Sequence, residues 1–241
     1  MARDKVYPSF EAAVCDIPDG ATIMVGGFGG PAGIPQNLIG ALRDQGTKNL
    51  TIIHNTGGFG LSGIGYAAPK DVSYDDHSIL IANKQVKKVI AAYPFPPSPS
   101  ASSPFKEQYL AGDVELEIVP QGTLAERIRA GGAGIGAFYV RTGVGTKVAK
   151  GKEQRVINSR KYILEYGLTA DYALIRAYKA DTLGNLIYRG TARTFNPIMA
   201  TAAKTTIVEV DEIVQPGDID PEYVITPFAY VDRIVKIPRE G

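Results

Sequence analysis

The chain has 241 residues, 44% of them apolar, so it can bury a sizeable core in one α/β domain or two small ones. Its formal net charge of +1 gives no electrostatic reason to expect nucleic acid or a membrane surface as a partner. The single cysteine, Cys15, excludes an internal disulfide and fits a reducing compartment. No apolar run approaches the ~20 residues that span a bilayer, and no signal-like segment follows the N-terminus. We therefore expect a cytoplasmic protein.

A glycine-rich segment, residues 25–35, follows a short apolar run at residues 21–25 and precedes a helical pattern that begins at Gln36. Glycine permits positive φ and close approach of the backbone to a ligand, and a helix N-terminus attracts anions. The alternative is a tight strand-to-helix turn packed against a neighbour. Five glycines within eight residues exceed what a turn needs, so the pattern favours a ligand cradle.

Two familiar kinds of glycine loop do not fit this segment. Gly27, Gly29 and Gly33 give the spacing G-x-G-x-x-x-G, whereas a dinucleotide fingerprint needs G-x-G-x-x-G. A phosphate-binding P-loop needs a lysine after its last glycine, and none follows here. The cradle is therefore of a third kind.

A second glycine-rich loop, residues 54–60, follows a short strand predicted at residues 50–53. Loops at the carboxyl ends of strands line the ligand crevice of an open α/β sheet, so we expect the two loops at one edge. Within the second loop, Asn55 either fixes a substrate or closes its own turn.

A strand predicted at residues 86–90 leads into residues 94–104, which hold five prolines. Such a segment cannot be helix or central strand, so it is a surface loop. A lid or a peptide-binding segment is possible, but a plain connector is favoured. Further on, residues 114–119 alternate as a half-exposed strand, and Thr123 with Glu126 has capping-box spacing for a helix over residues 124–129.

The C-terminal half alternates strand and helix patterns with two hairpins. One hairpin turns at Asn158 and Ser159, and the other at residues 181–185. This order predicts an α/β fold with a mostly parallel sheet flanked by helices and a small, hairpin-rich antiparallel part. We expect one domain over residues 1–241. The remaining elements are strands at 172–175, 205–210 and 231–236 and a helix after Thr194.

The chain holds no convincing nucleophile. Of its two histidines, His54 follows a strand and can reach the crevice, while His77 lies in a polar stretch and should be solvated. Glu209 follows a strand, where a solvated turn is the default expectation. No G-x-S-x-G elbow is present. The one cluster of metal-ligand residue types is Asp75 and Asp76 beside His77, and a solvated loop is favoured over a metal site there. The protein therefore either only binds a ligand or receives its reactive group from another chain.

Several ordered motifs resemble the A (alpha) subunit of family I coenzyme A-transferases, of the 3-oxoacid or 3-oxoadipate type. The resemblance spans residues 6–235 and implies a CoA-transferase or ribose-phosphate-isomerase-like fold. The motifs are residues 25–29 with 33–35, residues 120–134, residues 138–139 with 142–146, and residues 179–181 with 184–185.

This resemblance implies an enzyme that is active only with a B (beta) subunit. That partner contributes a glutamate, which attacks the acyl-CoA thioester, and a second carboxylic acid later takes over the CoA. Coenzyme A is then a substrate, and no cofactor or metal is implied. Glu165 superficially matches the Glu-x-Gly of that nucleophile, but it lies in the hairpin region and is interpreted as a decoy.

The resemblance also implies site residues. Gln121 stabilises the oxyanion through its amide N–H, and Asn55 lies near the acyl group. The wall against the substrate would be formed by Gly26, Gly27, Phe28, Gly29, Gly33 and Gly122. The chain departs from the family at residues 93–97, at Thr56 and by an insertion at residues 66–77. These departures leave open an acyl-CoA hydrolase, and a non-catalytic sugar-phosphate or effector sensor is a third hypothesis.

Overall fold

A computed structural model describes residues 5–28, 33–60, 75–98 and 100–238. Its centre is a sheet in the order β11-β10-β8-β1-β2-β3-β4, in which every neighbouring pair is parallel. A short strand, β9, pairs antiparallel with β8. The mostly parallel sheet predicted from the sequence is therefore confirmed. The strands are β1 (Thr22–Val25), β2 (Leu50–Ile53), β3 (Val86–Ala91), β4 (Glu115–Ile118), β8 (Ala170–Asp181), β9 (Leu186–Ile187), β10 (Ala203–Val214) and β11 (Arg233–Lys236).

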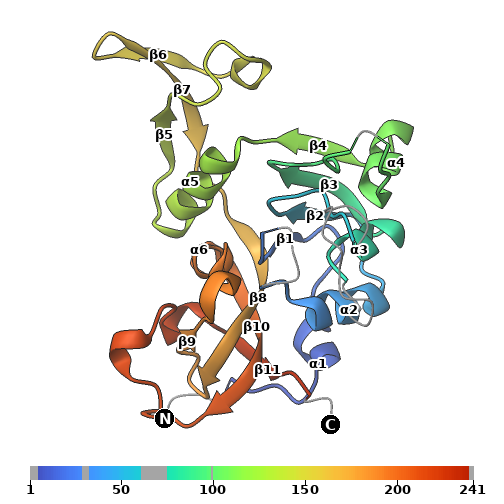
Figure 1. Ribbon diagram of the computed structural model, residues 1–241, viewed down its shortest axis with the longest axis vertical. Helices are drawn as coiled ribbons and strands as arrows, with labels where there is room; N and C mark the ends of the chain where they lie inside the picture. The colour runs from blue at the N-terminus through green and yellow to red at the C-terminus, as the bar shows by residue number, and fades with distance from the viewer. Residues whose placement is uncertain (1–4, 29–32, 61–74, 99, 239–241) are drawn as a thin grey trace.

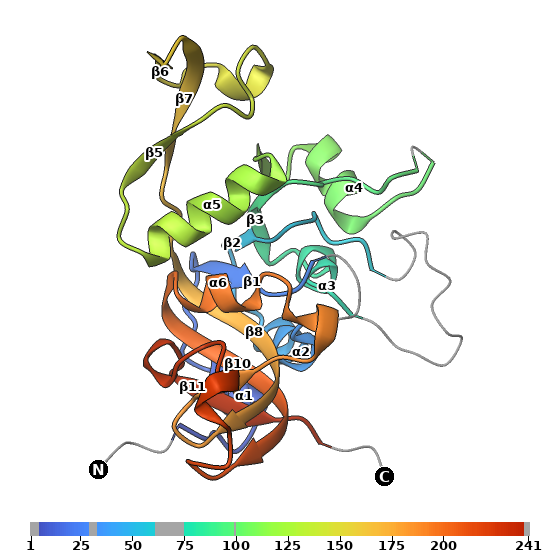
Figure 2. The same cartoon turned by 60° about the vertical axis from the view of Figure 1, so that its left-hand side comes forward.

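Helices cover both faces of this sheet (Figures 1 and 2). Alternate residues of β1 belong to different cores: Ile23 and Val25 pack with the first four helices, and Met24 packs with the last two. Both faces of the central strands are thus buried, as is usual in parallel sheets. The helices are α1 (Phe10–Val14), α2 (Gln36–Gln45), α3 (Ser78–Ala82), α4 (Pro104–Ala111), α5 (Gln121–Gly132) and α6 (Asn196–Ala200).

A second, antiparallel sheet projects from the body beyond α5 (Figure 1). Its strands are β5 (Ala137–Val140), β6 (Gln154–Ile157) and β7 (Arg160–Tyr166), with β7 in the middle. The predicted hairpin is confirmed, because Asn158 and Ser159 join β6 to β7 with φ of 48° and 62°. Positive φ at both turn residues matches the right-handed twist of the strands. We call β5, β6, β7 and the residues between them, 137–166, the arm.

The start of α5 differs from the prediction. Thr123 was expected to cap the helix, but the helix begins at Gln121 and continues to Gly132. Pro120 holds the extended backbone that precedes it, and Thr123 is buried within the first turn. The capping box is therefore wrong, and Gln121 becomes the first helical residue. Short 3₁₀ turns occur at η2 (Lys147–Ala149), η3 (Gly190–Arg193), η4 (Pro221–Tyr223) and η5 (Phe228–Tyr230).

In the described part of the chain, none of the helices has the length and apolar character that crossing a bilayer requires.

Candidate functional site

The loops that follow β1, β2 and β3 are joined by hydrogen bonds at the carboxyl edge of the sheet. Asn55 Nδ2 donates to the carbonyl oxygen of Phe28 at 3.0 Å. The Asn55 carbonyl in turn accepts from the backbone of Tyr93 at 2.9 Å, and Gly57 N donates to the Tyr93 carbonyl at 3.1 Å. The two glycine-rich loops therefore meet as predicted, and the segment after β3 joins them. Asn55 serves both loops rather than only closing its own turn.

The glycines of the first loop are packed against protein. A Cβ on Gly26 would lie 1.8 Å from Asn196 Oδ1, and one on Gly33 would lie 2.2 Å from the carbonyl oxygen of Ala192. The Gly26 N–H donates to the Leu174 carbonyl within the sheet, at 2.8 Å. Close packing against α6 and the turn before it thus accounts for these two glycines. Of the other predicted wall residues, Gly27 has φ of 104° and packs on Ile34, and Gly29 lies outside the described residues.

The N-terminus of α2 is occupied by a carboxylate of the protein itself. Glu209 Oε2, on β10, accepts from the backbone N–H groups of Asn37 and Leu38 at 2.9 and 3.0 Å. Burial raises the pKa of Glu209 to about 7, against the opposing effect of these N–H bonds and of Arg176. The solvated turn expected at Glu209 is therefore wrong. The helix end that the sequence offers to an anionic ligand is already capped.

Two buried histidines lie beneath the second loop, with ring centroids 4.5 Å apart. His54 Nδ1 donates to the Val25 carbonyl at 2.8 Å, and His77 Nε2 donates to the Thr56 carbonyl at 3.1 Å. Burial lowers the pKa of His54 to about 3, helped by the neighbouring His77, and burial also lowers the pKa of His77. The solvated His77 expected from its polar neighbours is wrong. At neutral pH both rings are uncharged; His54 binds the end of β1, and His77 binds the second loop at Thr56.

Asp76 holds the base of the second loop. Its Oδ2 accepts from the backbone N–H groups of Phe59 and Gly60 at 2.9 and 3.1 Å, and its Oδ1 accepts from Ser78 N at 2.8 Å. Burial alone would raise the pKa of Asp76, but His77 and these N–H donors hold it below its ordinary value. Most of the predicted insertion, residues 66–74, lies outside the described residues.

Gln121 and Gly122 lie at an open helix end. They begin α5 directly after β4, and Pro120 supplies no side-chain cap to the first turn. The first N–H groups of a helix have no partner within it, so they are available to an anion. A Cβ on Gly122 would meet no atom within 4 Å. Because β4 is three strands from β1, this helix end lies roughly 14 Å along the edge from the first loop.

Exposed apolar side chains surround this edge. Phe28, Tyr93 and Ile118 follow or end β1, β3 and β4, and they are 45%, 54% and 53% exposed. Phe28 stacks on Phe195 with centroids 5.9 Å apart, which holds its ring at the surface. A rim of large apolar side chains around polar donors is typical of a surface that another molecule covers.

No carboxylate or thiol lies in the described loop residues 26–28, 54–60, 92–98 and 120–122. Glu165, the decoy glutamate, is buried in β7 and pairs with Lys152 and Arg127. Within the described ranges, no group of three His, Cys, Asp or Glu side chains is placed to hold a metal. The described loops at this edge therefore provide backbone N–H donors and a binding surface.

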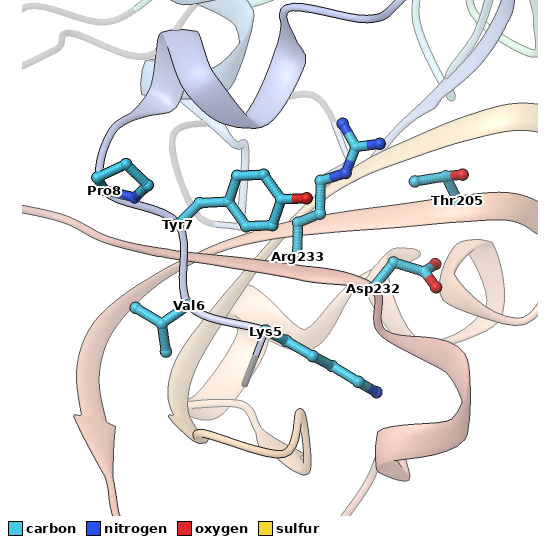
Figure 3. A pocket seen from close by; sticks show the side chains of 7 residues that line it. All are labelled: Lys5, Val6, Tyr7, Pro8, Thr205, Asp232 and Arg233. Carbon is cyan, nitrogen blue, oxygen red and sulfur yellow. The ribbon is translucent and has the colours of Figure 1, made fainter. Parts of the chain in front are cut away.

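A cavity of about 560 Å³ lies elsewhere, at the amino ends of β10 and β11 (Figure 3). The guanidinium of Arg233 at this cavity is bound by both carboxylate oxygens of Asp16, at 2.6 and 2.7 Å. Lys5 Nζ donates to the Phe228 carbonyl at 2.7 Å. The cationic groups at this cavity are thus bound by the protein itself. The cavity lies at the opposite end of the strands from the site loops.

Three residues at the site were not identified from sequence. Glu209 lies 171 positions from Leu38, and Asn196 lies 163 positions from Gly33, whose carbonyl accepts from its Nδ2. No local pattern signals such contacts. His77 was assigned to solvent because its neighbours are polar. Of these three residues only Asn196 had a signal in the sequence, because the Asn196-Pro197 pair marked the expected start of a helix.

Comparison with known proteins identifies the family. The coenzyme A transferase family matches residues 7–237. The A subunit of a probable succinyl-CoA:3-ketoacid coenzyme A transferase of Bacillus subtilis is 49% identical, over 96% of this chain and 89% of the relative. The A subunit of a 3-oxoadipate CoA-transferase of Pseudomonas putida is 50% identical, over 97% and 94%.

The fold is shared with solved structures as well. An acyl-CoA transferase of E. coli O157:H7, solved as a thioester complex with CoA, superposes with a TM-score of 0.80 at 23% identity, covering 100% of this chain and 48% of that one. The suspected resemblance and the α/β fold class are both confirmed. The chain belongs to the coenzyme A transferase family.

Proposed function

We propose that the chain is the A subunit of a heteromeric CoA-transferase. It moves CoA from succinyl-CoA or a similar acyl-CoA to a 3-oxo acid such as acetoacetate or 3-oxoadipate. The names of the two relatives at about 50% identity support this choice of substrates. The observation that carries the proposal is the open carboxyl edge, which has donors and an exposed apolar rim but no nucleophile in its described loops.

The missing nucleophile is a glutamate of the B subunit. Its carboxylate oxygen adds to the thioester carbonyl, and CoA leaves as the thiolate to give an acyl anhydride. The thiolate then attacks the glutamyl carbonyl and releases the first carboxylate, which leaves a glutamyl-CoA thioester. The acceptor carboxylate reverses these two steps and departs as the new acyl-CoA. Each addition places negative charge on a carbonyl oxygen.

Gln121 is the donor to that oxygen. Its N–H opens α5, where the helix dipole and the uncapped first turn favour negative charge. Preorganised donors of this kind are typically worth about 10²–10³ in rate. Gly122 keeps the approach clear, because nothing lies within 4 Å of the place where a Cβ would be.

The first loop forms the opposite wall. Asn55 fixes the Phe28 carbonyl through its Nδ2, so the backbone of the loop is held against the second loop. In our proposal the wall against the substrate also includes Gly26, Gly27, Gly29 and Gly33.

Further parts of this proposal concern the whole protein. Residues 1–241 act as one domain, in the cytoplasm, with CoA as a substrate and no other cofactor. The B subunit covers the rim of Phe28, Tyr93 and Ile118. Its arrival completes the site, so the isolated chain is inactive.

The test follows transfer from succinyl-CoA to acetoacetate and to 3-oxoadipate after the chain has been co-expressed with a B subunit. We expect transfer by the complex and none by either chain alone. Release of free CoA without an acceptor would instead identify a hydrolase. Thermal stabilisation of the isolated chain by sugar phosphates, with no transfer by the complex, would identify a sensor.

A further inference from the structure

Two consecutive residues of the C-terminal half, Phe195 and Asn196, contact the first loop from outside the site. Asn196 begins α6, which lies beside β1 in both views of the molecule (Figures 1 and 2). Neither residue belongs to the loops that line the carboxyl edge, and both are buried. Their contacts therefore support the first loop from behind, away from any substrate.

Asn196 holds the first loop at both of its ends. Its Nδ2 donates to the Gly33 carbonyl at 3.0 Å, and its Oδ1 is 1.8 Å from the place where a Cβ on Gly26 would be. The same Oδ1 accepts from the backbone N–H of Arg176 on β8, at 3.0 Å. The Asn196 side chain is fully buried, so water does not compete for these bonds. One amide thus ties the start and the end of the loop to the central sheet.

Phe195 supports the residue of the loop that faces the site. Its ring stacks on that of Phe28, with centroids 5.9 Å apart and an angle of 22° between the ring planes. Phe195 is only 6% exposed, whereas Phe28 is 45% exposed. Separations of 4.5–7 Å are those at which aromatic rings attract one another. Because Asn55 binds the Phe28 carbonyl, Phe28 is held by its ring from one side and by its backbone from the other.

The backbone that leads into this pair is strained. Thr194 has φ of 39° and ψ of −134°, in a region that a β-branched residue rarely adopts. Such strain persists only where the surrounding structure fixes it. Here Asn196 Nδ2 also donates to Thr194 Oγ1 at 3.2 Å and to the Ala192 carbonyl at 3.1 Å. The turn therefore spends stability on the placement of the two side chains that follow it.

The strand behind Asn196 is anchored in turn. The guanidinium of Arg176 binds Glu209 at 3.4 Å and Asp211 at 2.8 Å, both on β10. Glu209 also caps α2, the helix that follows the first loop. The end of the loop is thus held through Asn196 and through the cap of α2, and both supports meet at Arg176.

We propose that Phe195 and Asn196 are positioning residues for CoA transfer. Together they form a clamp that fixes the first loop, and with it Phe28, as a wall of the site. The inference rests on the proposed function, in which this loop faces the substrate. Misplacement of a positioning group by about 1 Å can cost about 10²-fold in rate. The clamp therefore acts on kcat, because the substrate keeps its other binding contacts.

A fluorescent reporter tests the clamp without any need for activity. The chain contains no tryptophan, so Phe28→Trp places a single indole in the first loop. Phe195→Leu removes the stacked ring. Asn196→Asp keeps the shape and the oxygen that binds Arg176, but it replaces the donor to Gly33 by an acceptor. Each should raise the acrylamide quenching constant of the isolated chain about twofold, because the loop loses a fixed contact.

Kinetics of the complex with the B subunit test the role in transfer. In the chain with Phe28 retained, Phe195→Leu and Asn196→Asp should each lower kcat about tenfold or more, with little change in the KM for succinyl-CoA. In a Phe28→Leu background, Phe195→Leu should have no further effect on kcat, because its ring acts through Phe28.

Met199→Ala is the matched control. Met199 is also fully buried in α6, and its truncation destabilises the core while both contacts to the loop remain. This variant should lower the urea midpoint but leave quenching and kcat unchanged. Circular dichroism checks the folding of every variant. If the buried carboxylate of Asn196→Asp prevents folding, Phe195→Leu alone supplies both measurements.

Unchanged quenching or unchanged kcat in the folded clamp variants would overturn the proposal. So would an equal loss of kcat in Met199→Ala, or a loss by Phe195→Leu that persists in the Phe28→Leu background. Failure of the proposed function gives a different result. The unaltered complex would then transfer no CoA, while quenching of the reporter would still respond to Phe195→Leu and Asn196→Asp.

Discussion

Two glycine-containing stretches of this chain lead from a strand into a helix, and they differ in what fills the helix end. At α2 the first-turn N–H groups of Asn37 and Leu38 are bound by Glu209, and Gly26 is packed on Asn196. At α5 the first turn has no side-chain cap, and the space beside Gly122 is empty. The same local pattern thus builds a closed support at one position and an open donor at the other.

This difference shows that glycine content alone does not locate a ligand. In the sequence, the five glycines of the first loop favoured a ligand cradle. In the structure, the atoms beside Gly26 and Gly33 leave no room for a side chain at these two positions. Gly122 stands alone in its turn and has no packing reason to be glycine. The chemistry is therefore expected at α5, and the first loop is expected to be a fixed wall.

The largest effect should come from removing the open donor. Gln121 is the first residue of α5, where proline is tolerated because that N–H has no partner within the helix. Gln121→Pro should lower the kcat of CoA transfer about 10²–10³-fold, the usual effect of losing an oxyanion donor, with an unchanged unfolding midpoint. Steady-state transfer assays and urea unfolding of the complex with the B subunit measure the two quantities.

Gln121→Ala serves as the matched variant, since it removes the side-chain amide but keeps the backbone N–H. A loss in Gln121→Pro that exceeds the loss in Gln121→Ala assigns the donor to the backbone. Full activity of a folded Gln121→Pro protein would falsify the proposed role.

The carboxylate that closes the other helix end gives a pH signature. The folded-state pKa of Glu209, about 7, is above its ordinary value of 4.5, so the folded protein retains a proton that the unfolded chain loses. The stabilisation is fully present below pH 4.5 and is lost as the pH rises through 7. Relative to Glu209→Gln, the free energy of unfolding should fall by up to about 3 kcal/mol between pH 4.5 and 7.5.

Urea unfolding of both proteins across this pH range measures the difference. The two buried histidines titrate in both proteins, so their contribution cancels in the comparison. Parallel stability curves for the two proteins would show that Glu209 stays ionised when folded.

The elements that were predicted correctly from the sequence are those that depend on local patterns. The strands at residues 50–53 and 86–90 and the turn at Asn158 and Ser159 depend on apolar runs and turn residues that act over a few positions. The mostly parallel character of the sheet, though not the order of its strands, followed from the alternation of strand and helix patterns. These features need no knowledge of distant contacts.

Apart from the misplaced start of α5, the errors were made where a residue distant in the sequence decides the outcome. Glu209 is buried because it caps a helix 171 positions away, and His77 is buried because it binds the Thr56 carbonyl across the second loop. Both were predicted to be solvated from their polar neighbours. Fold class and the meeting of the two glycine-rich loops at one edge were therefore predictable, whereas the distant residues that hold this edge in place were not.

The packing of the first loop, which leads into the capped end of α2, should not tolerate one added methyl group. Gly26→Ala places a Cβ 1.8 Å from Asn196 Oδ1, which also accepts the N–H of Arg176 at 3.0 Å. Overpacking of this kind costs about 1–3 kcal/mol of unfolding free energy. Gly40→Ala, in α2 with no atom within 4 Å of its Cβ position, is the control and should not destabilise. Equal urea midpoints for the two variants would contradict the closed-end interpretation.

The smallest effect on stability is expected at Gly122, where the comparison between the two helix ends is most direct. Alanine is favoured over glycine in a helix by up to about 1 kcal/mol, and the position has free space, so Gly122→Ala should match or slightly exceed the original stability. Transfer activity should nevertheless fall, because the added methyl projects beside the donors where the substrate and the partner's glutamate must approach. Gly40→Ala should gain similar stability and keep its activity, since α2 is capped by Glu209. If both alanine variants transfer CoA at the original rate, the open space at α5 has no role in catalysis, and the site must lie closer to Asn55 and Phe28.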